Sequence, residues 1–239
     1  MKIQVHPDAD AAATAGAKFI AAKAHEAVAA RGRFVMAVSG GLVPWQMFRI
    51  LANEPMPWEN VHVTQVDERA APAGDQDRNL THLRESLLSQ VPLPSEQAHA
   101  MAVEGDLEAA AASYAGLLRK IAGSPPVLDL VHLGLGPDGH TASLVPGDPV
   151  LEVTDRDVAV TGVYQKRRRM TLTYPILNRA RSILWLVNGP GKAEILQRLA
   201  DGDASIPAGR IWKDAAVLFA DRAAAGSTSA IVAKGTSCV

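Results

Sequence analysis

The chain has 239 residues and a formal net charge of −1 at pH 7, and 48% of its residues are hydrophobic while 21% are charged. These values are typical of one globular α/β domain, and without a basic excess we expect a protein that binds neither nucleic acid nor a membrane surface. The single cysteine, Cys238, excludes an internal disulfide and a thiolate-ligated metal cluster, and it suits a reducing cytoplasm, where we place the protein.

Helical and strand-like segments alternate along the chain. Alanine-rich segments with helical spacing lie at about 8–31 and 107–122, and the short apolar runs between helices read RFVMAVSGG, NVHVTQVDER, LDLVHLGLG and SILWLVNGPG. Continuous apolar runs of this kind predict an α/β fold with a mostly parallel central sheet that helices cover on both faces. No linker divides residues 1–224, so we expect a single domain there, followed by a small, polar tail at 225–239 whose composition permits disorder. Neither a signal peptide nor a membrane span is expected.

Each of the four apolar runs ends in a polar or glycine-rich cluster. The clusters are Ser39-Gly40-Gly41, Asp67-Glu68-Arg69, Gly134 to His140, and Asn188 to Lys192. Ligands of a parallel sheet bind outside the carboxyl ends of its strands, so we expect all four clusters to face one crevice.

The first two clusters each allow two interpretations. Glycines at 40 and 41, before a helix, would let a phosphate approach free backbone amides, but Ser39 could equally cap a tight turn. The carboxylates of Asp67 and Glu68 beside Arg69 could bind a sugar phosphate or position a general base, whereas three consecutive charges are usually a solvated surface run. Pro72 and the loop that leads to Asn79 favour a shaped loop over a plain surface.

The third cluster is the most specific. Gly134, Gly136 and Gly139 satisfy the dinucleotide-binding pattern G-x-G-x-x-G, but Pro146-Gly147 leaves barely one turn for the helix that this pattern needs, so we discount it. What remains is a turn that presents Asp138 and His140. Histidine is the side chain best suited to exchange a proton near neutral pH, although a histidine can also merely cap a turn.

Basic residues supply the remaining candidates. Lys192 follows Gly189-Pro190-Gly191 and opens a helical segment, where it could bind phosphate or lie in solvent. The basic run from Lys166 to Arg169 is mostly a solvated face, and Arg169, nearest to the next strand, is the residue expected to point inward. The scattered histidines lack metal-ligand spacing, so no metal site is expected. The G-x-S-x-G motif does not occur in the sequence, so a serine hydrolase is not expected either.

In this order, the clusters resemble the 6-phosphogluconolactonases of the glucosamine-6-phosphate isomerase/6-phosphogluconolactonase superfamily. That family pattern is roughly S-G-G-S-T-P, D-E-R with a later proline and S-N, G-x-G-x-D-G-H-x-A-S-L-F-P-G, R-x-T-x-T and G-x-x-K-A. The matching residues are Ser39-Gly40-Gly41, Pro44, Asp67-Glu68-Arg69, Pro72, Asn79, Gly134, Gly136, Asp138-Gly139-His140, Ala142-Ser143-Leu144, Pro146-Gly147, Arg169, Thr171, Thr173, Gly189 and Lys192-Ala193. The departures are Leu42 and Val43 for Ser-Thr, Arg78 for the serine before Asn79, and Val145 for phenylalanine. Leu42, Val43 and Arg78 leave the details of phosphate binding open.

The resemblance implies a Rossmann-like three-layer fold and hydrolysis of 6-phospho-D-glucono-1,5-lactone, the second step of the oxidative pentose phosphate pathway, with no cofactor. The expected binding partner is a small sugar-phosphate lactone. The protein itself is expected to be a monomer or a weak homodimer. His140 would take the proton from water, with Asp138 beside it and Asp67 orienting either the substrate hydroxyls or His140. The substrate and phosphate would be bound by Ser39, Gly40, Gly41, Arg69, Asn79, Gly136, Arg169 and Lys192.

Two other functions stay open at this point. An amino-sugar phosphate deaminase-isomerase shares the D-G-H turn, but there the turn resembles D-G-H-I-A-F-N-E-P, with an acidic residue where this chain has Val145. A catalytically silent sugar-phosphate sensor is the third interpretation, and the intact His140 argues against it.

Overall fold

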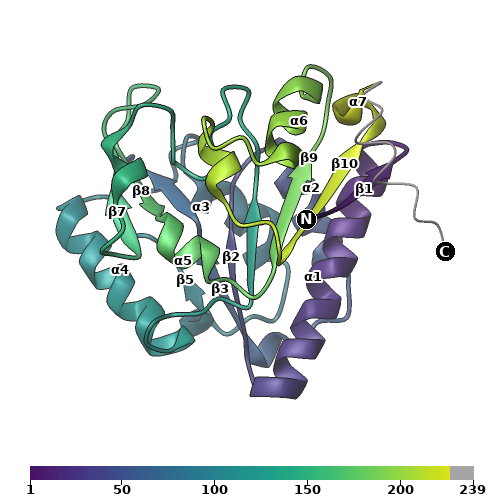
Figure 1. Ribbon diagram of the computed structural model, residues 1–239. Helices are drawn as coiled ribbons and strands as arrows, with labels where there is room; N and C mark the ends of the chain where they lie inside the picture. The colour runs from purple at the N-terminus through teal and green to yellow at the C-terminus, as the bar shows by residue number, and fades with distance from the viewer. Residues whose placement is uncertain (227–239) are drawn as a thin grey trace.

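The computed structural model describes residues 1–226. Its centre is a sheet of seven parallel strands in the order β1-β10-β9-β6-β2-β3-β5 (Figure 1). The strands are β1 (Lys2–His6), β10 (Ala216–Asp221), β9 (Ile183–Val187), β6 (Leu130–Leu133), β2 (Phe34–Val38), β3 (Val61–Gln65) and β5 (Ala98–His99). The predicted α/β fold with a mostly parallel sheet is therefore confirmed.

The inner strands are buried on both faces, which explains their continuous apolar sequences. In β2, Phe34 and Met36 belong to one hydrophobic cluster, while Val35 and Ala37 belong to another on the opposite face. Because side chains alternate along a strand, a run without polar residues fits only a strand that is covered on both sides.

Helices α1 (Ala9–Arg31), α2 (Leu42–Leu51) and α3 (Asn79–Leu83), with a π-helical turn at Arg84–Leu88, cover one face of the sheet. Asp8 caps α1 by accepting a hydrogen bond from the Ala11 amide at 2.8 Å, and Gly32, with φ of 71°, ends the helix. The buried side of α1 is mostly alanine, which lets the helix lie close to the strands.

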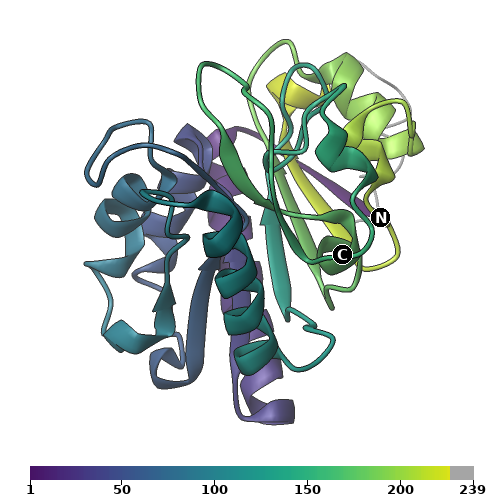
Figure 2. The same cartoon turned by 90° about the vertical axis from the view of Figure 1, so that its left-hand side faces the viewer.

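The other face carries a second, three-stranded antiparallel sheet in the order β4-β8-β7, together with the remaining helices (Figures 1 and 2). These elements are β4 (Asp67–Arg69), β8 (Arg169–Leu172), β7 (Val158–Val160), α4 (Leu107–Ala122), α5 (Tyr174–Asn178), α6 (Ala193–Asp201) and α7 (Arg222–Ala225). Short 3₁₀ helices occur at Trp58–Asn60, Ser95–Gln97, Pro149–Glu152 and Pro207–Arg210. The two helical layers and the sheet between them make the predicted three-layer sandwich.

The strand order reverses between β2 and β6. From β2 the chain proceeds outward through β3 to β5, whereas β6, β9 and β10 follow one another on the other side of β2. Such a switch point opens a crevice at the carboxyl ends of the two strands, and this is where ligands of open α/β sheets bind.

At three places the local structure differs from the expected one or extends beyond the described residues. Asp67-Glu68-Arg69, expected as a loop, is the strand β4, because its backbone pairs with β8. Thr141–Val145 forms a Thr141–Leu144 bridge and no helical turn. The predicted tail begins at residue 225, within α7, which continues to Ala225. Residues 227–239 of that tail lie outside the described residues. The single domain over 1–224 stays a prediction.

Within residues 1–226, no helix has the length and apolar character needed to cross a bilayer.

Candidate active site

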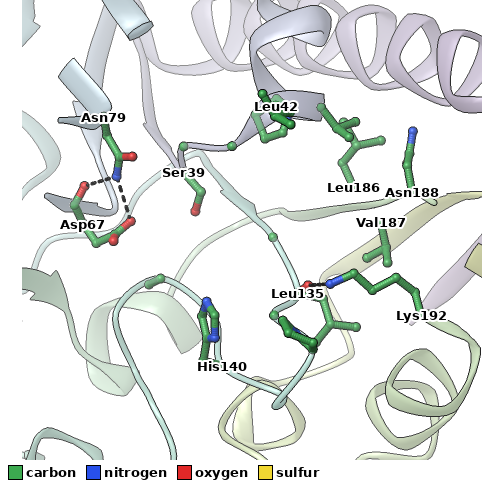
Figure 3. A pocket seen from close by; sticks show the side chains of 18 of the residues that line it. Ser39, Leu42, Asp67, Asn79, Leu135, His140, Leu186, Val187, Asn188 and Lys192 are labelled. Atoms are coloured by element: carbon green, nitrogen blue, oxygen red, sulfur yellow. Dashed lines mark hydrogen bonds between the residues drawn. The ribbon is translucent and has the colours of Figure 1, made fainter. Parts of the chain in front are cut away.

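A cavity of about 430 Å³ opens at the carboxyl ends of β2, β6 and β9. All the predicted site residues except Asp138 line this cavity, and they come from all four sequence clusters. The lining residues are Ser39, Gly40, Gly41, Leu42, Val43, Pro44, Asp67, Arg69, Asn79, Gly134, Leu135, Gly136, Pro137, His140, Ala142, Arg169, Leu186, Val187, Asn188 and Lys192. The expected convergence of the clusters on one crevice is therefore what the structure shows (Figure 3).

The loop between β2 and α2 forms one wall of the cavity. A Cβ atom at Gly40 would overlap the Asn79 side chain, and Gly41 has φ of 136°, so glycine is required at both positions. Gly41 occupies the N-cap of α2 without a side-chain cap, which rules out the capping role considered for Ser39. The first amides of α2 have no intrahelical acceptor, and together with the helix dipole they favour an anion. The buried Ser39 hydroxyl has no hydrogen-bond partner in the described chain.

Asp67 is buried and fixed from two sides. Its Oδ2 accepts a hydrogen bond from Ser143 Oγ at 2.6 Å. Asn79 Nδ2 donates to its backbone oxygen at 2.9 Å, as Figure 3 shows. Asp67 and His140 share no hydrogen bond in the described chain, so of the two roles considered for Asp67, contact with substrate hydroxyls fits the geometry better.

Glu68 is fully buried and is no part of a solvated charge run. Its carboxylate accepts hydrogen bonds of 2.8 Å from the amides of Arg69, Asn79 and Leu80 and from the Gln65 side chain. A carboxylate with this many donors fixes the backbone of β4 and the start of α3. Glu68 thereby places Asp67 and Asn79 at the cavity without lining it.

Arg69 and Arg169 lie directly opposite each other on β4 and β8. The Nε atoms of both guanidinium groups are buried and have no acceptor within residues 1–226. Burial lowers the pKa of Arg169, and the neighbouring charge of Arg69 lowers it further. Two adjacent, partly unsatisfied guanidinium groups form a positive site that an anionic substrate would stabilise.

His140 lies at the end of the glycine-rich turn, with its side chain 22% exposed. Its Nδ1 donates to Asp138 Oδ1 at 2.6 Å, since a carboxylate only accepts, and this leaves Nε2 as the basic nitrogen. The ring packs so closely on Gly136 that a Cβ atom there would overlap it. Burial acts to raise the pKa of Asp138, but the backbone hydrogen bond and charge of His140, with the Tyr164 hydroxyl, bring this pKa below its ordinary value.

Tyr164 and Ser143 take part in the site although no sequence pattern predicted a role for them. The Tyr164 hydroxyl donates to Asp138 Oδ2 at 3.2 Å, and the tyrosine ring lies edge-on to His140, with 5.6 Å between ring centroids. The signal for Tyr164 was its place just ahead of the basic run that contains Arg169. Ser143, the partner of Asp67, stands in the D-G-H-x-A-S motif itself.

Lys192 lies on the side of the cavity next to Leu135 (Figure 3). Its ammonium group donates to the Leu135 backbone oxygen at 2.7 Å. Burial lowers the pKa of Lys192, while the charge of Asp138 acts in the opposite direction. A lysine held at this position is available to an anion, which supports the binding interpretation over a lysine in open solvent.

Two departures from the family pattern differ in their consequences. Arg78 is buried, forms ion pairs with Glu104 and, at 3.7 Å, with Glu68, and does not line the cavity. Leu42, which is 89% exposed, and Val43 do line it and leave backbone amides where the pattern has hydroxyls. Arg78 therefore makes no direct contact with the cavity, whereas Leu42 and Val43 change the surroundings of the anion site.

Comparison with known proteins gives a consistent family. The profile of the glucosamine-6-phosphate isomerases/6-phosphogluconolactonase family matches residues 7–219. The chain is 38% identical to the 6-phosphogluconolactonase of Mycobacterium tuberculosis over 93% of this chain and 96% of that protein. The crystal structure of 6-phosphogluconolactonase from Thermotoga maritima superimposes with a TM-score of 0.81 at 26% identity, covering 92% of this chain and 98% of that one. A monomeric glucosamine-6-phosphate deaminase shares the fold, with a TM-score of 0.81 at 19% identity over 94% and 99% of the two chains.

The profile match spans nearly the whole length over which the motifs were found, and the relatives match along most of their own length. Sequence motifs, strand order and the position of the cavity all agree with this grouping. The chain therefore belongs to the glucosamine-6-phosphate isomerase/6-phosphogluconolactonase family.

Proposed function

We propose that the chain is a 6-phosphogluconolactonase that hydrolyses 6-phospho-D-glucono-1,5-lactone to 6-phospho-D-gluconate, the second step of the oxidative pentose phosphate pathway. One observation carries the proposal: the Asp138–His140 pair leaves a basic imidazole nitrogen at a cavity that is also lined by the buried Arg169 and the half-buried Arg69. The similarity to the Mycobacterium tuberculosis lactonase supports the same reaction.

The proposed chemistry is general base catalysis by His140. Its Nε2 takes a proton from a water molecule as the water oxygen attacks the lactone carbonyl carbon, and Asp138 stabilises the imidazolium that forms. The tetrahedral intermediate then breaks its bond to the ring oxygen, and the imidazolium returns the proton to that oxygen. No covalent enzyme intermediate is required.

The remaining polar groups of the site would bind three parts of the substrate: the oxyanion, the sugar hydroxyls and the phosphate. Backbone amides of the Gly136 turn or the guanidinium of Arg69 would stabilise the oxyanion. Asp67, held by Ser143 and Asn79, would accept hydrogen bonds from sugar hydroxyls. Arg169, Lys192, Arg69 and the amides next to Ser39 would bind the phosphate.

The deaminase alternative is less consistent with the site. The position at which deaminases have an acidic residue is occupied by Val145, which is 4% exposed and does not line the cavity. Ammonia release from glucosamine 6-phosphate would reveal a deaminase, and tight binding of 6-phosphogluconate without turnover of either substrate would reveal a sensor.

The decisive experiment generates the lactone from glucose 6-phosphate in a coupled assay and follows its disappearance with and without protein. We expect acceleration over spontaneous hydrolysis, unchanged by EDTA. Activity lost in EDTA and restored by a divalent ion would contradict the cofactor-free mechanism, and no acceleration at all would contradict the lactonase. The cytoplasmic location and the monomer or weak dimer stay predictions.

A further inference from the structure

The hairpin that carries Tyr164 has an unusual turn. Tyr164 and Arg167 exchange backbone hydrogen bonds of 3.0 and 3.2 Å around Gln165 and Lys166, which have φ values of 50° and 70°. Two-residue turns with positive φ at both positions normally contain Asn or Gly, so Gln-Lys is a strained choice. The strain is maintained only if neighbouring contacts fix the turn.

Arg167 supplies those contacts. Its guanidinium forms ion pairs with Asp75 at 3.0 Å and with Asp77 at 2.7 Å, in the loop that follows β4. Arg69 donates to the Asp77 backbone oxygen at 2.7 Å, so the same loop holds one of the cavity arginines. The hairpin is thereby tied to the wall of the cavity, with Tyr164 beside His140 and Arg169, which line it.

Tyr164 contacts both the Asp138–His140 pair and Arg169. Its hydroxyl donates to Asp138, its ring edge meets the His140 ring, and the Arg169 guanidinium lies over its ring face at 4.9 Å. A guanidinium over an aromatic face is attracted by the ring quadrupole. One side chain therefore connects the proposed base to a proposed substrate-binding arginine.

We propose that Tyr164 is a positioning residue that keeps the Asp138–His140 pair and Arg169 in one reactive arrangement, an inference that rests on the proposed lactonase function. Its hydroxyl orients Asp138 and through it His140, while its ring supports Arg169. The two tasks reside in different parts of the side chain and can be separated by substitution.

The hydroxyl has a predictable effect on the pH dependence. The charged or titratable groups that face Asp138 are His140, Tyr164 and Lys192. Without the phenolic donor, the pKa of Asp138 rises, and its less satisfied carboxylate holds the imidazole proton more firmly. This stronger hold favours the protonated imidazole, so the acid limb of the kcat/KM profile should move upward.

The test compares Tyr164→Phe with Tyr164→Leu. Tyr164→Phe keeps the ring, so we expect kcat to fall about tenfold, as for a lost hydrogen bond to a charged group, with KM little changed and the acid limb displaced to higher pH. Tyr164→Leu also removes the ring from Arg169, so KM should rise as well. Circular dichroism and thermal unfolding establish whether the variants are folded. If Tyr164→Leu is not folded, Tyr164→Phe alone tests the proposal.

Tyr174 offers a matched control. Its hydroxyl donates to the Pro207 backbone oxygen at 3.0 Å, and the Arg210 guanidinium lies 4.6 Å from its ring centroid, away from the cavity lining. Tyr174→Phe removes a similar hydrogen bond beside a similar cation–ring contact. We expect its kcat and its acid limb to match those of the wild type.

The failures of the two proposals are distinguishable. A folded, active wild type whose Tyr164→Phe variant keeps both kcat and the acid limb overturns the role of Tyr164. A wild type that binds 6-phosphogluconate but does not accelerate lactone hydrolysis overturns the function instead. In that case, NMR of the His140 ring tests the role of Tyr164. If the hydroxyl positions Asp138 and His140, its removal in Tyr164→Phe shifts the Nδ1–H resonance from its wild-type position. If the hydroxyl has no such role, the resonance is unchanged.

Discussion

β6 and the turn that follows it carry two histidines in opposite environments. His132 lies inside the strand and is fully buried, with the Phe48 ring edge-on at 5.7 Å, a long 3.4 Å contact from the Ser39 amide to Nδ1, and no partner for Nε2 in the described chain. His140 lies beyond the strand end, partly exposed and paired with Asp138. The same residue type is thus placed once in the core and once at the cavity.

The difference shows what makes a histidine available for proton transfer. Burial without a carboxylate lowers the pKa of His132 to about 3, so this imidazole stays neutral under ordinary conditions. His140 has a carboxylate on Nδ1 and an open position at Nε2, which is the arrangement that lets an imidazole accept a proton and be stabilised afterwards. Substitutions at these two histidines and at the phosphate contacts test this contrast.

The largest effect is expected at His140. His140→Asn keeps a similar shape and some hydrogen bonding but cannot take a proton near neutral pH, so kcat should fall by about 10²–10⁴. Affinity for 6-phosphogluconate, measured by calorimetry, should be retained because the proposed phosphate groups are untouched. A folded variant that binds product normally and turns over within a few-fold of the wild type would defeat the assignment of the base.

A smaller effect is expected at the proposed phosphate contacts. Losing one charge-assisted contact costs about 1.5–3 kcal/mol, or roughly ten- to a hundredfold. Arg169→Ala and Lys192→Ala should therefore narrow the preference for the phosphorylated lactone over gluconolactone by that factor. The measurement is the ratio of the two kcat/KM values, and an unchanged ratio in both variants means that neither residue binds the phosphate.

The sequence sufficed for the frame of the molecule and for most of the cavity. Apolar runs that end in glycine or charge mark strands and their carboxyl ends, because covered parallel strands and ligand-binding turns each have a local signature. This is why the sequence alone was enough to place Gly40, His140 and Lys192 at one crevice.

What the sequence could not indicate depends on pairing between distant segments. Asp67-Glu68-Arg69 looked like a charged loop because its partner strand β8 lies about a hundred positions away, and only that pairing with the donors around Glu68 explains the burial of these charges. Tyr164 was missed for the same reason: its contact with Asp138 spans 26 positions and follows no period. Arg78 is held by Glu104, another partner that local patterns do not reveal.

His132 should make the fold sensitive to acid. Its pKa is about 3 in the folded chain against an ordinary 6.5, so between these values the unfolded chain binds one more proton. Stability is therefore complete above pH 6.5 and is lost as the pH falls toward 3, by up to about 1.4 kcal/mol per pH unit. Chemical unfolding of the wild type and of His132→Leu between pH 7 and pH 4 measures this slope.

The variant isolates the contribution of His132. His99, whose pKa burial also lowers, to about 4, adds to the acid sensitivity of both proteins and cancels in the comparison. We expect His132→Leu to lose less stability on acidification than the wild type. Equal slopes in the two proteins would mean that His132 takes up no proton when the chain unfolds.

The smallest effect is expected when His132→Leu is assayed for catalysis. The only polar contact it removes within the described chain is the long one from the Ser39 amide, and a neutral hydrogen bond contributes about 0.5–1.5 kcal/mol at normal length. Loss of this bond can loosen the Ser39–Gly41 loop and raise KM a few-fold, while kcat stays near the wild-type value because the imidazole that moves the proton is His140. If His132→Leu lowered kcat as far as His140→Asn does, the buried histidine would belong to the proton path, and burial could not be what separates the two.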